Sequence, residues 1–375
     1  MSRLQELGIT PVINAAGTYT VLGGARLAPP VIAAMAEAAQ TFLDLEQLAT
    51  AVGARLAAAT GNEAAVVTSG AAAGVAIAIA ACVAGSDPER IATFPAAGAA
   101  ARVIVQKSQR NGYDYSARMT GIQLIEIGGA ARTTLTDLDA ALVNDPACVL
   151  VFVGEQFDRG AVPLREVTTA ARARGVPVVV DAAAGVPPIA NLWQLTRAGA
   201  DLVVFSGGKG LRGPQATGLV VGRGELVAAC VANMSPHHTI GRPMKVGKEE
   251  LLGLLAAVEW SLALDEPEYL ASLERYVATW IAGLRDIPGI HVERGIPVAA
   301  AEPLPRALVR LDGADRAARD HLVAEIRARG VAVHTDGDAS LAINPQTVAE
   351  DEVELVLAAV RAVLLARTAG DGGGD

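Results

Sequence analysis

One lysine stands where an amine could act as a nucleophile. Ser206-Gly207-Gly208-Lys209 follows the apolar run from Leu202 to Phe205 and leads into a loop rich in Gly, Arg and Pro. Partial burial in such a turn makes an amine reactive, and the Ser206 hydroxyl could bind a phosphate. A nucleotide-binding loop is the alternative, but its G-x-x-x-x-G-K-[ST] pattern requires Ser or Thr after the lysine. Gly210 stands there instead.

A carboxylate ends a second apolar run. Asp181 follows Val178 to Val180, and an ionised carboxylate beside a buried strand is costly unless a cation or donor pairs with it. The protonated ring nitrogen of a cofactor could pair with Asp181 and would then withdraw electrons more strongly. Ala183 could lie against the face of that ring. A helix cap or a metal ligand is the alternative role for this aspartate.

A third strand end leads into a stretch of small residues, Ser69-Gly70-Ala71-Ala72-Ala73-Gly74. The free N–H groups and the dipole of the helix predicted to start here suit a phosphate, and Ser69 adds a hydroxyl. Tight packing of the helix on the sheet would also explain the small residues.

The elements that must position these motifs alternate between short apolar strands and helices. Continuously apolar strands are typical of a sheet covered on both faces, so the sequence predicts a mostly parallel, doubly wound α/β domain. In such sheets ligands bind beyond the carboxyl ends of the strands, which would bring the three motifs to one edge. The expected strands are Ala64–Thr68, Arg90–Phe94, Arg102–Gln106, Gln123–Ile127, Cys148–Val153, Val176–Val180, Leu202–Phe205 and Gly218–Val221.

The order of the motifs is informative. A phosphate cradle, a carboxylate and a lysine occur in that order, and 28 positions separate Asp181 from Lys209. This arrangement resembles the large domain of fold-type I enzymes that use pyridoxal 5'-phosphate (PLP). The resemblance implies that PLP forms a Schiff base with Lys209, that Asp181 contacts the ring nitrogen, and that Ser69, Gly70, Ala71, Ala183 and Ser206 complete the cofactor site.

Nearly the whole chain resembles one branch of these enzymes, the selenocysteine synthase-like proteins, and most closely the D-glucosaminate-6-phosphate ammonia-lyase-like members. The lysine loop and the Gly-Arg-Pro-Met-Lys segment are the most specific of the shared motifs. These motifs are Ile13–Thr18, Gly112–Asp114, Val180–Ala183, Phe205–Gln215 and Gly241–Glu250.

Other polar residues are assigned by their place in these motifs. Gln109 stands where the resemblance leads us to expect a ring-stacking histidine, and its planar amide is expected to contact the cofactor in that place. Gln156 follows the strand from Cys148 and is also expected to face the cofactor. Arg212, Arg242 and Lys245 are cations in Gly- and Pro-containing segments, and we expect one or more of them to hold a substrate anion. Surface solubility is the alternative explanation for these three cations.

The pattern of apolar and polar residues changes along the chain, and these changes suggest a division into domains. Residues 1–44 precede the first core strand and are expected to pack on a small domain. Residues 45–250 form the large PLP-binding α/β domain, 251–367 a small α+β domain, and 368–375 a disordered tail.

The charge and composition of the chain limit the kinds of partner that it could bind. The formal net charge is −9, which disfavours nucleic acid. Cys82, Cys148 and Cys230 are few and far apart, so neither a disulfide scaffold nor a structural zinc site is expected. The first eight residues lack the layout of a signal peptide, and no apolar run is long enough to cross a bilayer. We therefore expect a cytoplasmic protein that binds no metal and no membrane. The resemblance implies a homodimer or a larger homo-oligomer.

The expected activity is that of a PLP-dependent lyase. Its substrate would be a small anionic hydroxylated 2-amino acid, an amino-sugar acid phosphate being one candidate. Lys209 would remove the Cα proton, and loss of the Cβ hydroxyl would lead to a 2-keto acid and ammonia. Racemisation or epimerisation and aldol cleavage are alternatives. A non-catalytic scaffold is disfavoured because Lys209, Asp181 and Ser206 are all present.

Overall fold

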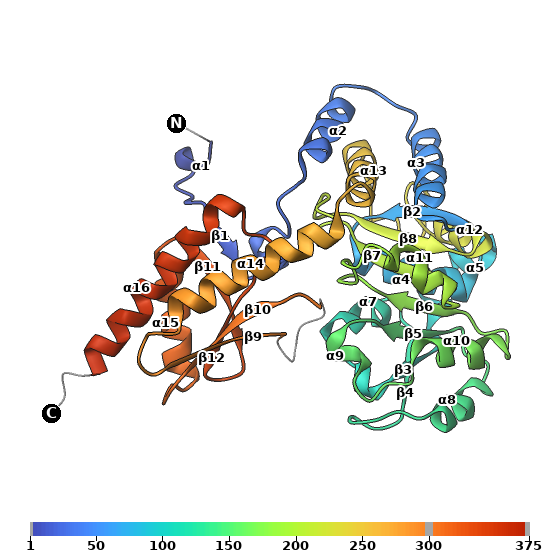
Figure 1. Cartoon of the computed structure of the whole chain (residues 1–375). Helices are drawn as coiled ribbons and strands as arrows, with labels where there is room; N and C mark the ends of the chain where they lie inside the picture. The colour runs from blue at the N-terminus through green and yellow to red at the C-terminus, as the bar shows by residue number, and fades with distance from the viewer. Residues whose placement is uncertain (1–2, 297–302, 372–375) are drawn as a thin grey trace. The chain divides into compact units, whose positions relative to one another are not determined.

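The chain divides into a large unit, residues 26–264, and a small unit that combines its first 25 residues with those from Asp265 onward. The computed structural model describes residues 3–296 and 303–371 (Figure 1). Both units contain a β-sheet with helices packed on it, as expected when apolar strands and amphipathic helices alternate.

A seven-stranded sheet forms the centre of the large unit. β8 runs antiparallel to both its neighbours, and the other neighbouring pairs are parallel. This confirms the predicted mostly parallel α/β sheet. In spatial order the strands are β2 (Ala64–Thr68), β8 (Gly218–Gly222), β7 (Leu202–Ser206), β6 (Val178–Asp181), β5 (Cys148–Phe152), β3 (Arg102–Gln106) and β4 (Gln123–Ile127).

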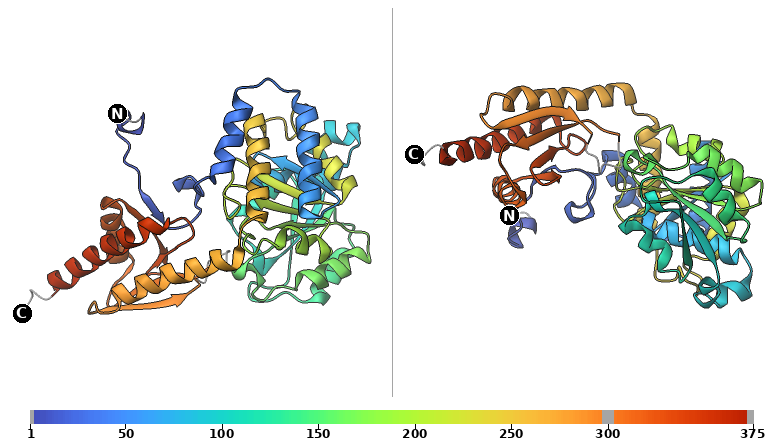
Figure 2. Two further views of the ribbon diagram at one scale, coloured as in Figure 1. Left: turned by 45° about the horizontal axis from the view of Figure 1, so that its top comes forward. Right: turned by 90° about the horizontal axis from the view of Figure 1, so that it is seen from below.

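Helices cover both faces of this sheet (Figure 2). On β7, Val203 and Phe205 join a core cluster with α3, α10, α11 and α13, whereas Val204 faces α4. A Cβ at Gly74 of α4 would lie 2.7 Å from Val204, so glycine permits this close approach. The helices are α2 (Pro29–Ala39), α3 (Leu45–Thr60), α4 (Ala71–Ala84), α5 (Pro88–Ala92), α6 (Ala96–Ala99), η2 (Lys107–Gln109), η3 (Gly112–Asp114), α7 (Tyr115–Arg118), α8 (Leu135–Leu142), α9 (Glu155–Asp158), α10 (Leu164–Arg172), α11 (Asn191–Arg197), α12 (Gly224–Ala232) and α13 (Lys248–Leu262).

The predicted strand Arg90–Phe94 is wrong, because this segment falls in the short helix α5. The Asp87 side chain caps the helix by accepting from the backbone N–H groups of Glu89 and Arg90, and Pro88 occupies its first position. Both features favour a helix start. The local capping signal therefore outweighed the strand propensity of a short apolar run.

The small unit contains a five-stranded sheet with three long helices. Trp280 is fully buried in its core and donates to the Val353 carbonyl at 3.0 Å. In spatial order the strands are β1 (Ile13–Ala15), β11 (Val331–Asp336), β12 (Ser340–Ile343), β10 (Arg306–Leu311) and β9 (Ile290–Gly295); the helices are α1 (Arg3–Glu6), η1 (Thr20–Leu22), α14 (Glu266–Leu284), α15 (Arg316–Ala328), η4 (Glu350–Glu352) and α16 (Val353–Asp371).

The boundaries between the units fall at residues 25 and 264 rather than at 44 and 250. β1 pairs with β11, which holds the beginning of the chain in the small unit as expected. Residues 26–44 instead belong to the large unit, because α2 packs on α13. The expected disordered tail also begins too early, since α16 continues through Asp371; residues 372–375 lie outside the described residues.

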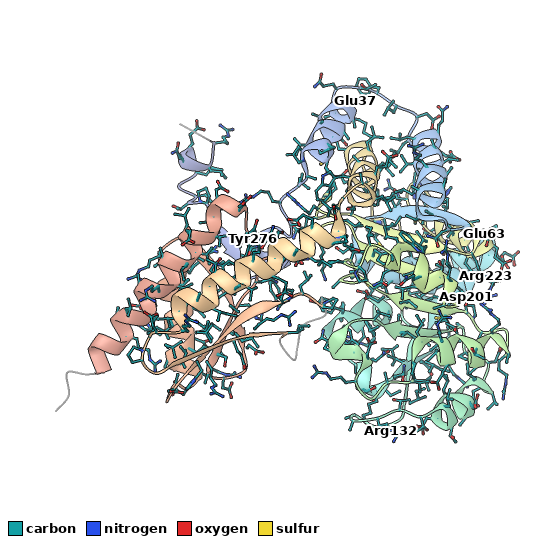
Figure 3. All side chains as sticks on the ribbon, in the orientation of Figure 1. Glu37, Glu63, Arg132, Asp201, Arg223 and Tyr276 are labelled. Carbon is teal, nitrogen blue, oxygen red and sulfur yellow. The ribbon has the colours of Figure 1, made fainter. Side chains whose placement is uncertain are left out.

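An ion pair fixes the amino-terminal edge of the parallel strands in the large sheet. Asp201 accepts from the Val178 backbone N–H at 2.8 Å and from Arg223 at 2.8 Å, and thereby joins the beginnings of β6 and β7 to the end of β8. Figure 3 shows Asp201 and Arg223 side by side. Strand register set at this edge also determines which residues meet at the opposite, carboxyl edge.

Candidate active site

Lys209 lies in a tight turn that only glycines can form. A Cβ at Gly207 would lie 2.7 Å from Leu254, and one at Gly210 would lie 2.7 Å from the Val186 carbonyl carbon. Gly207 donates to the Thr217 carbonyl at 2.8 Å and Arg212 donates to that of Lys209 at 2.9 Å. These contacts hold the partly buried lysine at the carboxyl end of β7.

Asp181 and Ser206 lie beside each other at the same edge of the sheet. Asp181 is paired with Val204, and the Ser206 N–H donates to the Ala183 carbonyl at 3.3 Å. The Asp181 carboxylate accepts from the Ala183 N–H at 2.9 Å. Burial raises the pKa of Asp181, although that hydrogen bond and the charge of Lys209 oppose the rise. A cationic partner at this carboxylate would stabilise its ionised form.

The segment predicted to bind a phosphate, Ser69–Gly74, lies at the same edge, because it follows β2 and β2 pairs with β8. Gly218 is paired with Thr68 of β2 on one side and with Ser206 of β7 on the other. A Cβ at Gly218 would lie 2.6 Å from the carbonyl of Gly70, so this glycine makes room for the turn before α4. Gly70 begins α4 without a side-chain cap, which leaves the N–H groups of the first turn for a ligand.

Gln109, which stands where a ring-stacking residue is expected, is bonded to the protein backbone. Its side chain is 2 % exposed. The amide donates to the carbonyls of Phe152 and Phe157, at 2.9 and 3.2 Å, and accepts from the Phe152 N–H at 3.1 Å. The amide therefore fixes the chain that leaves β5, and its contact with the cofactor stays a prediction.

Tyr113 is the aromatic residue that approaches the lysine. The Lys209 Nζ lies 5.8 Å from the centroid of the Tyr113 ring, which is 63 % exposed. The Asn111 side chain accepts from the Tyr113 N–H at 2.7 Å. Sequence reasoning did not assign this residue a role, although Gly112-Tyr113-Asp114 is one of the shared motifs and was the available signal.

Asp114 anchors the turn that carries Tyr113. Its carboxylate is buried and bonds to Arg110 and to Arg118, the latter at 2.8 Å. Burial opposes ionisation, but the hydrogen bonds from both arginines outweigh it and hold the pKa of Asp114 below its ordinary value. Arg110 also pairs with Glu126 on β4. The turn is thereby tied to the edge of the sheet.

Arg212 is used within the fold. Its guanidinium lies 5.0 Å from the centroid of the Trp260 ring and donates to the Arg26 carbonyl at 3.0 Å. The Arg212 carbonyl accepts from the Ala28 N–H at 3.1 Å. These contacts hold residues 26–28 to the lysine loop and to α13, and the role of Arg212 in substrate binding stays a prediction.

Arg242 and Lys245 lie in the loop between α12 and α13. Asn233 holds this loop to Gly85, at the carboxyl end of α4, by a hydrogen bond of 3.0 Å. Among the described residues, no hydrogen bond or ion pair joins either cation to the lysine turn. Their role with substrate remains a prediction, as does that of Gln156, which is partly exposed on α9 after β5.

Comparison with known proteins identifies the family. The model of the family described as aminotransferase class-V matches residues 31–362. The chain belongs to this family. Its members use PLP, and the chain is a PLP-dependent enzyme of fold-type I, as the sequence predicted.

Proteins similar to this chain have several different activities. A 5'-C-glycyluridine monooxygenase-decarboxylase from Streptomyces sp is 37% identical over 96% of this chain and 92% of the relative. The D-glucosaminate-6-phosphate ammonia lyase of Salmonella typhimurium is 30% identical over 96% and 97%. A solved structure of such an ammonia-lyase has a TM-score of 0.82 at 28% identity and covers 98% of this chain and 99% of its own.

An L-seryl-tRNA(Sec) selenium transferase from Solidesulfovibrio magneticus is 31% identical over 63% of this chain and 57% of the transferase. Together these relatives confirm the resemblance to the selenocysteine synthase-like branch and to its ammonia-lyase-like members.

The residues at the carboxyl edge fit PLP chemically. The uncapped start of α4 suits its phosphate, the carboxylate of Asp181 suits a protonated ring nitrogen, and Lys209 supplies the amine for a covalent link. Ser206 adds a hydroxyl two strands from the cradle. These individual assignments are predictions that the arrangement supports.

Residues 3–296 and 303–371 contain neither a metal-binding group of side chains nor a membrane-spanning helix. No group of three or more His, Cys, Asp or Glu side chains there could hold a metal ion. No helix in these ranges is long and apolar enough to cross a membrane.

Proposed function

We propose that this family member is a lyase that converts a small anionic hydroxylated 2-amino acid to a 2-keto acid and ammonia. The juxtaposition of Lys209, Asp181 and the start of α4 at one sheet edge carries the proposal, together with full-length similarity to an ammonia lyase. An amino-sugar acid phosphate is a candidate substrate, since that relative is a D-glucosaminate-6-phosphate ammonia lyase.

Each residue has a defined part in this reaction. PLP, when bound, supplies a ring that stabilises negative charge at the substrate Cα. The first turn of α4 and Ser206 would hold the phosphate, and Asp181 would keep a proton on the ring nitrogen. Lys209 would hold the cofactor covalently, and its amine would serve as the base that removes the substrate Cα proton.

The test is to supply hydroxylated 2-amino acids, with and without a terminal phosphate, and to measure ammonia and 2-keto acid. Solvent deuterium at Cα is followed in the same samples. Equal release of keto acid and ammonia supports the lyase. Deuterium uptake with loss of optical activity and no ammonia would refute elimination and indicate a racemase. Release of an aldehyde instead would indicate aldol cleavage.

A second candidate function is oxidative decarboxylation of a 2-amino acid. The observation that favours it is the 37% identity to a monooxygenase-decarboxylase over 96% of this chain. This reaction also begins at Cα, but it would consume dioxygen and release carbon dioxide. An oxygen electrode and a carbon dioxide assay on the same substrate panel distinguish the two, because elimination proceeds equally well without oxygen.

We also propose that the enzyme works as a homodimer or a larger homo-oligomer. Three large apolar side chains are exposed within four positions, Phe42 and Leu43 in the linker between α2 and α3 and Leu45 at the start of α3, with Phe42 fully exposed. Such a cluster on a surface is typical of an interface. Light scattering at micromolar concentration tests this: a fully active monomer would refute it.

The free thiols support a reducing compartment for this enzyme. Cys82, Cys148 and Cys230 form no disulfide, in keeping with the proposed cytoplasmic location. Fractionation of cells that express the tagged chain tests this location.

A further inference from the structure

We propose that Tyr113 is the acid that protonates the hydroxyl group leaving Cβ. This inference rests on the proposed lyase function and deepens it. The observation that carries it is the position of the phenol beside the reactive amine: the Lys209 Nζ lies 5.8 Å from the centre of the Tyr113 ring.

Elimination of water requires two proton transfers at neighbouring carbons. A base removes the Cα proton, and an acid must protonate the oxygen on Cβ, because hydroxide is a poor leaving group. General acid catalysis of this kind contributes roughly 10²–10⁴-fold to a rate. Lys209 accounts for the base, and a second side chain that supplies the acid allows both proton transfers to occur together.

The separation of the two groups suits one small substrate. The Cα hydrogen and the Cβ oxygen of a 2-amino acid are close neighbours, and each must come within about 2.6–3.2 Å of its catalytic group. The Lys209 Nζ lies 5.8 Å from the centroid of the Tyr113 ring, so the two side chains border the same space, and we place the phenol hydroxyl at the Cβ oxygen there. The 63 % exposure of Tyr113 leaves its side chain accessible to a ligand.

The protein backbone holds Tyr113 firmly although its ring is exposed. The Asn111 side chain accepts from the Tyr113 N–H at 2.7 Å, and the buried carboxylate of Asp114 is bonded to Arg110 and Arg118. A mobile surface tyrosine would not need an anchored neighbour of this kind. Such fixed geometry is a requirement of an efficient catalytic group.

The protons balance over one turnover. Lys209 takes the proton from Cα, the Cβ–O bond breaks, and the phenol proton converts the leaving hydroxide to water. The phenolate of Tyr113 then recovers a proton from the ammonium of Lys209, which restores both groups. The unsaturated amine released from the enzyme takes up one water to give the 2-keto acid and ammonia, so no oxidant or reductant is consumed.

The experiment compares two leaving groups in the Tyr113→Phe variant. Chloride needs no proton to leave, so the 3-chloro analogue of a hydroxylated substrate bypasses the acid. We expect kcat for the hydroxylated substrate to fall about 10²-fold or more, while turnover of the chloro analogue falls less than about threefold. Tyr115→Phe is the matched control, because Tyr115 is equally exposed but contacts Arg118 rather than the lysine.

Measurements on the cofactor separate a catalytic role from a structural one. The Kd for PLP, its absorbance band and the thermal midpoint of Tyr113→Phe should match those of the wild type. An equal loss with both leaving groups, or full activity on the hydroxylated substrate, would overturn the assignment. A wild-type enzyme that eliminates chloride but yields no keto acid from any hydroxylated substrate would overturn the proposed function itself, and this inference with it.

Discussion

The Gln109 amide both donates to the Phe152 carbonyl, at 2.9 Å, and accepts from the Phe152 N–H, at 3.1 Å. A side chain that satisfies a backbone residue in this way replaces a neighbouring strand at the point where β5 leaves the sheet. The residue at which a cofactor contact is expected therefore also supports the backbone where β5 ends.

Gln109→Leu should lower the free energy of unfolding by about 1–3 kcal/mol, because buried backbone groups of Phe152 and Phe157 would lose their partners. Urea denaturation of the cofactor-free protein measures this. Gln123→Leu is the control: Gln123 donates to the Ala99 carbonyl at an exposed position, and its loss should cost less than about 0.5 kcal/mol. A variant of Gln109 with unchanged stability but lost PLP binding would instead support the predicted contact between Gln109 and the cofactor.

Lys209→Ala should abolish the absorbance band of the covalently bound cofactor. Borohydride reduction followed by mass spectrometry should then find no PLP attached to the protein, since no other lysine lies in the glycine turn. Lys245→Ala, at an exposed position in another loop, should retain the attachment. Labelled Lys209→Ala protein would move the covalent link to a different lysine.

Asp181→Asn should have opposite effects on the empty and the loaded enzyme. Burial raises the pKa of Asp181 above its unfolded value, so its favourable contribution is complete below the unfolded pKa and is lost as the pH rises through the folded pKa. At neutral pH the neutral amide of this variant avoids the free-energy cost of burying an ionised carboxylate. The thermal midpoint of the variant without PLP should therefore stay equal or rise. With PLP, turnover should fall about 10²–10³-fold, as for other preorganised charges.

Asp201→Asn provides the contrast to that variant. Asp201 accepts from Val178 and Arg223 at the other edge of the sheet, so its loss should lower the thermal midpoint with or without PLP. Near-normal turnover by Asp181→Asn would mean that the reaction does not need a protonated ring nitrogen.

Gly210→Ala should displace the lysine turn. The added methyl would lie 2.7 Å from the Val186 carbonyl carbon, and overpacking of this kind costs about 1–3 kcal/mol. We expect weaker PLP binding and a lower thermal midpoint. Gly129→Ala is the control, because the nearest atom to its added methyl lies at 3.5 Å. Equal PLP affinity in both variants would show that the turn tolerates a side chain.

The amino-acid sequence alone determined the class of fold and the cofactor class. Continuously apolar strands such as Val149–Val151 are typical of burial on both faces, and Asp181 ends β6 while Lys209 follows β7 within three positions, so these predictions rest on local patterns. Residues 26–44 were placed in the wrong unit because no local pattern records that α2 packs on α13. The roles of Gln109, Arg212 and Tyr113 likewise depended on partners 43, 186 and 96 positions away. Only the tertiary structure decides such long-range contacts, because strand order and loop packing, rather than spacing along the chain, bring those partners together.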